Sequence, residues 1–160
     1  MGRVKDTQAD LSRAGAVERL YREQGDRIWR ALLAYAGDPE IASDAAAEAF
    51  AQLIRRGDEV RDPQRWVWRA AFRIAAGDLK RRRPVPLMSE GAYELELPSI
   101  ELANALRELP ARQRSAVVLH YVADLPVREV ASILGVTTGS IKVHLSRGRE
   151  RLRDLLGEET

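Results

Sequence analysis

A proline-bounded acidic stretch near the middle of the chain restricts its fold more than any other feature. Residues 84–99 read PVPLMSEGAYELELPS, with three prolines, one glycine and neither lysine nor arginine. Prolines at both ends disfavour a continuous helix, so this stretch is predicted to be an extended linker. The 160-residue chain is therefore expected to form two small units, at 12–83 and 99–157, joined by a linker at 84–98.

The composition favours helices in both units. Hydrophobic residues make up 45% of the chain and charged residues 31%, and leucine, alanine, arginine and glutamate are frequent, which favours packed helices over strands. The fold class is therefore predicted to be all-α.

Several function classes are disfavoured by what the sequence lacks. It contains no cysteine and only two histidines, His120 and His144, which excludes disulfides and thiolate sites and leaves few ways to build a metal or catalytic centre. We expect no metal, no cofactor and no enzymatic activity. No apolar run approaches the length of a membrane span, so we expect a cytoplasmic protein without membrane contact.

Capping signals set the expected helix boundaries. Asp38-Pro39 and Asp62-Pro63 each pair an N-cap with a proline at the first helical position, and they predict helices over 39–56 and 63–82. Apolar residues at helical spacing predict an earlier helix that Gly25 should bend or interrupt: Val17, Leu20, Tyr21, Ile28 and Leu32. In the second unit, Ser99, Pro110 and Pro126 predict helices near 100–109, 111–123 and 126–134, followed by one at 138–156.

The spacing of Ala131, Gly135 and Ile141 is typical of a helix-turn-helix. The small residue allows two helices to cross closely, the glycine permits a left-handed turn, and the branched residue fills the core. Thr137 is the expected N-cap of the second helix. The second unit is therefore predicted to bind DNA; the alternative is a surface helix with a solvated basic face.

The last helix should present one apolar and one polar face. Its apolar stripe contains Ile141, Leu145, Gly148, Leu152, Leu155 and Leu156. The opposite arc, with Gly139, Lys142, Val143, Ser146 and Arg147, is suited to major-groove docking, and base contacts are expected near the helix start, which adds Ser140. His144 flanks this arc, while His120 is expected at the edge of the core.

Two faces of the first unit are also candidates for function. In the helix 39–56, one arc is apolar and includes Phe50, Leu53 and Ile54. Asp44, Glu48 and Gln52 recur on the other side, and form a polar arc that is either solvated or a docking surface. In the helix 63–82, Arg65, Arg69, Arg73 and Lys80 share a basic arc beside Trp66. An aromatic ring next to cations is suited to stacking on an unpaired base; packing of Trp66 against a neighbouring helix is the alternative.

Three stretches together resemble an extracytoplasmic-function (ECF) sigma factor, the minimal two-domain class of bacterial RNA polymerase specificity subunits. They are residues 17–50, 62–83 and 109–152, and the last opens with the pattern Leu-Pro-x-x-Gln-Arg before the helix-turn-helix. The resemblance implies that the first unit opens the minus-ten promoter element and that the second reads the minus-thirty-five element.

The resemblance also implies roles for individual residues. The polymerase-binding positions are Asp44, Ala47, Glu48 and Phe50, to which the polar arc adds Gln52. Trp66 and Arg73 match positions near the pocket for a flipped base, and Arg65, Arg69 and Lys80 accompany them on the minus-ten arc. The positions that contact the minus-thirty-five element are Thr138, Gly139, Lys142, Val143, His144, Ser146, Arg147 and Arg149. The family commonly has glutamine in place of Ala47 and often asparagine in place of Arg73.

The leading hypothesis is therefore a transcription initiation factor, with core RNA polymerase and promoter DNA as partners and an anti-sigma factor as a further one. Under this hypothesis the acidic linker mimics nucleic acid in a basic channel. The alternative is a stand-alone helix-turn-helix regulator, in which the polar arc of 39–56 would be a dimer face.

Overall fold

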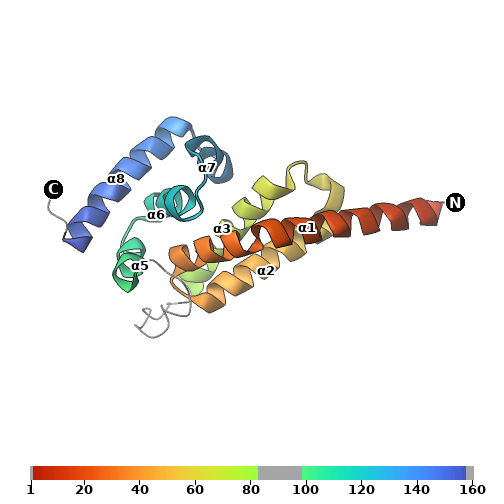
Figure 1. Cartoon of the computed structure of the whole chain (residues 1–160), viewed down its shortest axis with the longest axis horizontal. Helices are drawn as coiled ribbons and strands as arrows, with labels where there is room; N and C mark the ends of the chain where they lie inside the picture. The colour runs from red at the N-terminus through yellow and green to blue at the C-terminus, as the bar shows by residue number, and fades with distance from the viewer. Residues whose placement is uncertain (1, 83–98, 158–160) are drawn as a thin grey trace.

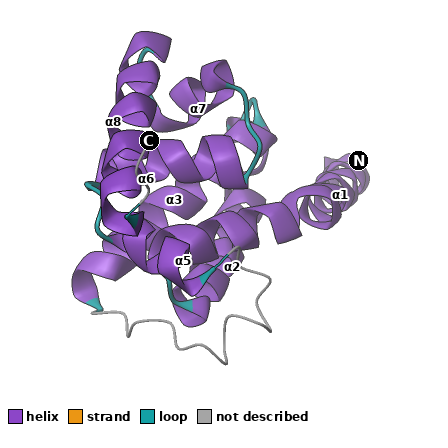
Figure 2. Cartoon of the chain, turned by 60° about the vertical axis from the view of Figure 1, so that its left-hand side comes forward, coloured by secondary structure: helices purple, strands orange, loops and turns teal. Residues whose placement is uncertain are grey.

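The computed structural model describes residues 2–82 and 99–157, with side chains described from residue 7 onward. The predicted linker at 84–98 lies outside the described residues. Within these ranges the chain is helical and has no strand, as predicted (Figure 2). None of the described helices is long and apolar enough to span a membrane.

The first unit consists of three helices, α1 (Gly2–Ala36), α2 (Pro39–Arg56) and α3 (Pro63–Arg81), with the short 3-10 turn η1 (Gly57–Glu59) before α3. The Asp38 carboxylate accepts bonds from the backbone N–H groups of Glu40 and Ile41, and Asp62 accepts one from Arg65. Both predicted proline starts are therefore confirmed. The predicted interruption at Gly25 is wrong, because α1 runs unbroken through it; packing farther along the helix outweighs the ~1 kcal/mol that an interior glycine costs.

The second unit contains α5 (Ile100–Arg107), α6 (Ala111–Val117), α7 (Val127–Leu134) and α8 (Thr138–Leu156). Ser99 caps α5 by accepting a bond from the Leu102 N–H. The helix expected over 111–123 changes at Val118 into a π-helical turn, η2 (Val118–Val122). His120 is half-buried there, and its Nδ1 lies 2.8 Å from the Leu125 carbonyl oxygen, which agrees with the predicted core-edge position.

The two units pack against each other around one continuous apolar core. In Figure 1, α1, α2 and α3 form one layer, α5 to α8 gather at one end of it, and the N-terminal part of α1 projects beyond the other helices. The largest fully buried side chains come from both units: Trp68, Ile28, Leu32 and Leu33 from the first, Leu119 and Ile141 from the second. The contact between the units is therefore part of the fold.

Two apolar predictions in the first unit are wrong. Tyr21 and Ile54 are 58% and 60% exposed, although their spacing placed them on apolar arcs. The Tyr21 ring contacts the Phe50 ring and Ile54 lines a groove beside α1, and in both cases most of the side chain stays exposed.

Candidate functional site

The turn between α7 and α8 has the predicted helix-turn-helix geometry. Gly135 ends α7 in the left-handed region, with φ 69° and ψ 35°, and its N–H bonds to the Ala131 carbonyl. The Thr137 hydroxyl then accepts a bond from the Ser140 N–H at 3.1 Å and starts α8. Ala131 and Ile141 are 5% and 0% exposed. The small residue, the glycine and the branched residue therefore perform the packing roles expected from their spacing.

The inner face of α8 is held closely against α6. A Cβ atom added at Gly148 would lie 2.7 Å from Cγ2 of Val117, so only glycine fits this crossing. Leu145 is buried beside it. Leu155 was predicted on the same stripe but is 42% exposed, because it lies at the edge of the stripe in the last turn.

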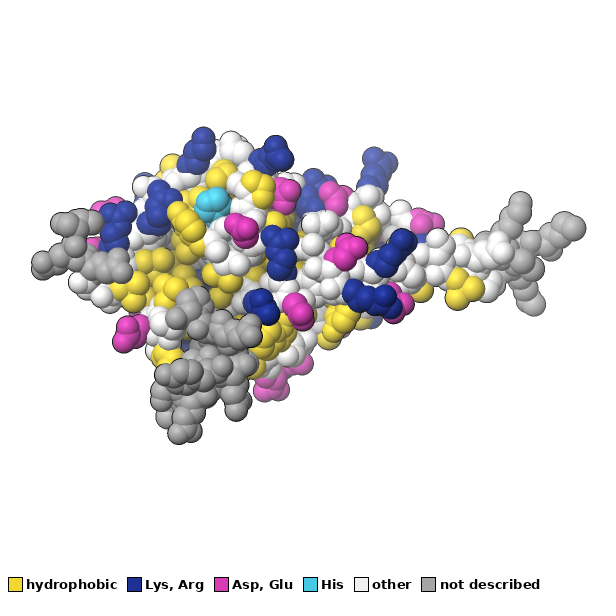
Figure 3. Space-filling view, viewed as in Figure 1, with side chains coloured by type: hydrophobic (Ala, Val, Ile, Leu, Met, Phe, Trp, Pro, Cys, Tyr) yellow, Lys and Arg dark blue, Asp and Glu magenta, His cyan; other side chains and the backbone are white. Residues whose placement is uncertain are grey.

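The outer face of α8 is exposed over most of its length. Thr138, Gly139, Lys142, Val143, Ser146, Arg147 and Arg149 are exposed, while Ser140 and His144 are half-buried. Lys142 and Arg147 form no hydrogen bond or ion pair with the described residues, whereas Arg149 donates to the Tyr121 hydroxyl at 2.6 Å. Lysine and arginine side chains follow α8 in the space-filling view (Figure 3). The face thus offers free cations near the helix start, as a groove-binding helix requires.

The polar arc of α2 is an organised surface. Asp44, Ala47 and Glu48 are exposed. Gln52 and Arg55 donate to Glu48 Oε1 at 3.1 and 2.9 Å, and these two hydrogen bonds, Gln52 first, lower the pKa of the Glu48 carboxyl. The side chain is therefore fixed in place and ionised at neutral pH.

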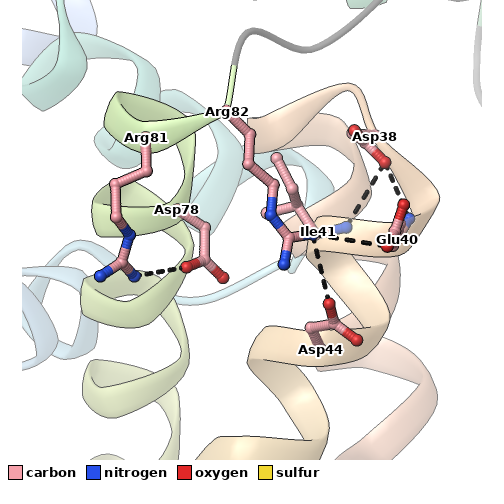
Figure 4. Close-up of polar contacts among 7 residues, drawn as sticks. All are labelled: Asp38, Glu40, Ile41, Asp44, Asp78, Arg81 and Arg82. Carbon is pink, nitrogen blue, oxygen red and sulfur yellow. Dashed lines mark hydrogen bonds and ion pairs between the residues drawn. The ribbon is translucent and has the colours of Figure 1, made fainter.

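The beginning of this arc is joined to the end of α3. Figure 4 shows Arg82 reaching from α3 to Glu40 and Asp44 of α2, with N–O distances of 3.6 and 3.3 Å. The preceding residue, Arg81, pairs with Asp78 at 2.6 Å. The exposed pairs of Arg82 orient the carboxylates of α2 more than they stabilise the fold.

Phe50 does not share this exposure. It is 5% exposed, and the Tyr21 ring packs on it edge-on with 5.1 Å between centroids. Phe50 was predicted among the polymerase-binding residues, but in this structure its ring is buried and packs α2 against α1. Phe50 is therefore not part of the exposed polar arc.

The two tryptophans of α3 have separate positions. Trp68 is 1% exposed in the core, whereas Trp66 is half-buried and carries the Arg56 guanidinium 5.6 Å from its ring centroid. The cation beside Trp66 is thus Arg56 rather than a member of the predicted arc. An aromatic face flanked by a cation is nevertheless present at the beginning of α3.

The basic arc of α3 faces the second unit. Arg65 Nη1 donates to Ser132 Oγ at 3.0 Å. Arg69 lies close to Gly135, since a Cβ atom added at Gly135 would be 3.2 Å from Arg69 Nη2. Arg73 and Lys80 are exposed. Two of the predicted minus-ten residues, Arg65 and Arg69, thus lie beside the helix-turn-helix, and Arg65 is hydrogen-bonded to it.

Two arginines that the sequence did not single out join the units. Arg27 of α1 donates to the carbonyls of Ala123 and Asp124. Arg114 of α6 donates to the carbonyls of Tyr35, Arg107 and Leu109 at 3.1–3.3 Å, and lies over the Tyr35 ring at 5.1 Å. Burial lowers the pKa of Arg114. Arg114 is the last residue of the Leu-Pro-x-x-Gln-Arg pattern, and that pattern could have singled it out. Its contact with Tyr35 could not have been predicted, because Tyr35 is 79 residues away in the sequence.

Comparison with known proteins assigns this geometry to a family. Residues 99–152, from the cap of α5 into α8, match the family model for sigma-70, region 4. The ECF RNA polymerase sigma factor SigW of Bacillus subtilis is 27% identical over 82% of this chain and 83% of its own length. The corresponding SigE of Mycolicibacterium smegmatis is 25% identical over 98% of this chain and 68% of its own. This chain is similar to ECF sigma factors over most of its length.

Solved structures share the whole arrangement of this chain. CnrH, determined in complex with the cytosolic domain of CnrY, superposes with a TM-score of 0.77 at 22% identity, covering 99% of this chain and 98% of CnrH. The sigma factor RpoE of Bartonella quintana, determined with the anti-sigma factor NepR, gives 0.68 at 18% identity, covering 89% and 99%. The fold of two packed helical units is therefore common to these proteins.

Proposed function

We propose that this chain directs core RNA polymerase to specific promoters and helps to melt them. The observation that carries the proposal is the exposed polar face of α8 behind a complete helix-turn-helix, in a chain similar to ECF sigma factors over nearly its full length. The roles of individual residues below follow from this proposal.

The second unit is suited to reading duplex DNA at the minus-thirty-five element. Arg147 and Lys142 are exposed and without partners among the described residues, so they can donate to base edges or phosphates when α8 enters the major groove. Arg151 and Arg153, farther along α8 and also exposed, are expected to contact phosphates only.

The polar arc of α2 is proposed to bind the polymerase. Asp44 and Glu48 are exposed carboxylates held in position by Arg82, Gln52 and Arg55. Carboxylates held in fixed positions on one helix face complement a basic helical surface and steer its approach. Ala47 between them leaves the helix surface flat.

The first unit is proposed to bind the single strand of the minus-ten element through Trp66 and the basic arc. Stacking on an aromatic ring holds an unpaired base regardless of its identity. Because Arg65 and Arg69 face α7 here, this step requires the two units to separate. The chain would thus bind melted DNA only in an open arrangement.

An anti-sigma factor is proposed as a further partner. RpoE, which has the same fold, was solved with the anti-sigma factor NepR, and the exposed faces of α2 and α8 are surfaces that an inhibitory protein could cover.

The proposal is tested by gel filtration of the chain with core RNA polymerase, followed by fluorescence anisotropy of a labelled promoter duplex. We expect co-elution, and promoter binding by the mixture that neither component shows alone. A chain that binds the duplex equally well without polymerase, and does not co-elute with it, would instead be a stand-alone regulator.

A further inference from the structure

A cavity of about 300 Å³ lies between the two units. Its walls come from α1, α3, α6, α7 and α8, so neither unit forms it alone. Three arginines line it, Arg69 and Arg73 from α3 and Arg112 from α6, together with His144 of α8. No aspartate or glutamate is found among the described residues of the lining.

The positive charge in this cavity is not neutralised by the described part of the chain. Arg69, Arg73 and Arg112 form no hydrogen bond or ion pair with any described residue, and the buried Nδ1 of His144 has no partner there. Arg114 adds a further guanidinium behind Tyr35, one of the lining residues. Like charges brought together in a partly enclosed space repel one another, and a bound anion would remove this repulsion.

The remaining lining is apolar and partly aromatic. The rings of Tyr35 and Phe72 lie 5.3 Å apart, and Ile133, Leu134 and Val136 add aliphatic surface to the lining. The volume is at the lower end of the ~300–1,000 Å³ of small-molecule sites. A cavity lined by both guanidinium and apolar groups matches a molecule that carries a phosphate and an apolar or ring-shaped part.

We propose that this cavity binds a small phosphate-bearing molecule of nucleotide size, and that binding holds the two units together. Arg73 and Arg112 clamp the phosphate from opposite units, and the rings of Tyr35 and Phe72 contact the rest of the molecule. Because the site exists only when the units are packed together, the ligand stabilises that arrangement over the open one. The ligand site goes beyond the proposed function and does not depend on it, whereas the effect of the ligand on the open arrangement rests on the proposed function.

The direct test is isothermal titration calorimetry of the full chain with pyrophosphate, with ADP and with uncharged adenosine. We expect ADP and pyrophosphate to bind with one-to-one stoichiometry, and adenosine at least tenfold more weakly than ADP. The variants Arg112→Ala and Arg73→Gln should each weaken ADP binding about tenfold or more, since each removes charge-assisted hydrogen bonds. Both side chains are exposed, so the variants should keep the wild-type circular dichroism spectrum.

The matched control is Arg61→Ala, which removes the same charge from an exposed position outside the cavity. Equal weakening by Arg61→Ala and Arg112→Ala would show non-specific attraction of anions and would overturn the site. Absence of binding by both pyrophosphate and ADP at millimolar concentration would overturn it as well.

A second measurement tests whether the ligand holds the two units together. The chain has no cysteine, so Glu18→Cys and Glu150→Cys, both at exposed positions, allow fluorescent labelling of one residue in each unit. ADP should raise energy transfer between the dyes in the otherwise wild-type chain and leave it unchanged with Arg112→Ala. Binding without any rise in transfer would contradict the claim that the ligand holds the units together.

Discussion

The guanidinium of Arg65 donates a hydrogen bond to the hydroxyl of Ser132, with 3.0 Å between Nη1 and Oγ. The bond connects α3, proposed to bind the melted minus-ten strand, with α7 of the helix-turn-helix. A residue proposed to contact promoter DNA is thus engaged within the chain. Under the proposed function, the contact between the units has to open before this residue can bind the melted strand.

The double variant Arg27→Ala, Ser132→Ala should shift the chain toward the open arrangement. It removes the bonds from Arg27 to the Ala123 and Asp124 carbonyls and the acceptor of Arg65. Losing these polar links should move the closed–open equilibrium roughly tenfold or more. Energy transfer between dyes at positions 18 and 150 should fall. Arg61→Ala, which removes an exposed arginine without a partner among the described residues, is the control, and an equal fall in that variant would refute the explanation.

Glu48→Lys should abolish binding of core RNA polymerase. The change replaces an exposed carboxylate, oriented by Gln52 and Arg55, with a cation that a basic partner surface would repel. The measurement is co-elution with polymerase, with circular dichroism to verify the fold. Glu18→Lys makes the same charge reversal on the exposed face of α1 and should bind normally; retained binding by Glu48→Lys would remove α2 from the interface.

The pKa of Glu48 sets the pH dependence of the same interaction. Its hydrogen bonds lower the pKa of the Glu48 carboxyl in the folded chain. The carboxylate therefore stays ionised at neutral pH and also at pH values where an ordinary glutamate begins to be protonated. Polymerase affinity should therefore not change through titration of Glu48 between pH 6 and pH 8. The Glu48 contribution should be lost only as the pH falls through its lowered pKa. In affinity measurements on wild type and Glu48→Gln, a difference that varies between pH 6 and pH 8 would contradict this assignment.

Arg147→Ala should weaken specific DNA binding by ~1–3 kcal/mol if Arg147 reads a guanine. Random DNA should be affected much less. Arg153→Ala should instead weaken binding to every sequence and make its salt dependence shallower, as expected for a phosphate contact. Equal losses on promoter and random duplexes for Arg147→Ala, measured by anisotropy, would show that Arg147 reads no base.

Gly148→Ala should destabilise the second unit by ~1–3 kcal/mol through overpacking. The added methyl group would meet Val117 Cγ2 at 2.7 Å, and α8 would have to move away from α6. Gly77→Ala is the matched control in α3, because its nearest contact would be the flexible end of Arg81 at 3.9 Å. Chemical denaturation should show a lower midpoint for the first variant only; equal midpoints would contradict the crossing geometry.

The features that could be predicted from the sequence are those set by local chemistry. The caps at Asp38, Asp62 and Thr137 and the left-handed turn at Gly135 each depend on a few adjacent residues. The exposed face of α8 followed from its periodicity alone. These predictions agree with the structure because propensity and packing favour the same conformation there.

What could not be predicted depends on contacts between distant residues. Periodicity placed Phe50 and Ile54 on one apolar arc, but only Phe50 is buried, with the Tyr21 ring packed against it. The positions of Arg65 beside Ser132 and of Arg114 beside Tyr35 depend on how two separate units meet, and neither helix pattern contains that information. The cavity between the units went unpredicted for the same reason.

Reconstituted run-off transcription tests the central claim most directly. Core RNA polymerase, purified without any sigma factor, is combined with the chain and with genomic fragments selected for binding by the mixture. The account predicts discrete transcripts that require the chain and disappear with Glu48→Lys. Transcription that is unchanged by adding the chain, or DNA binding by the chain that only represses it, would contradict its assignment as an initiation factor.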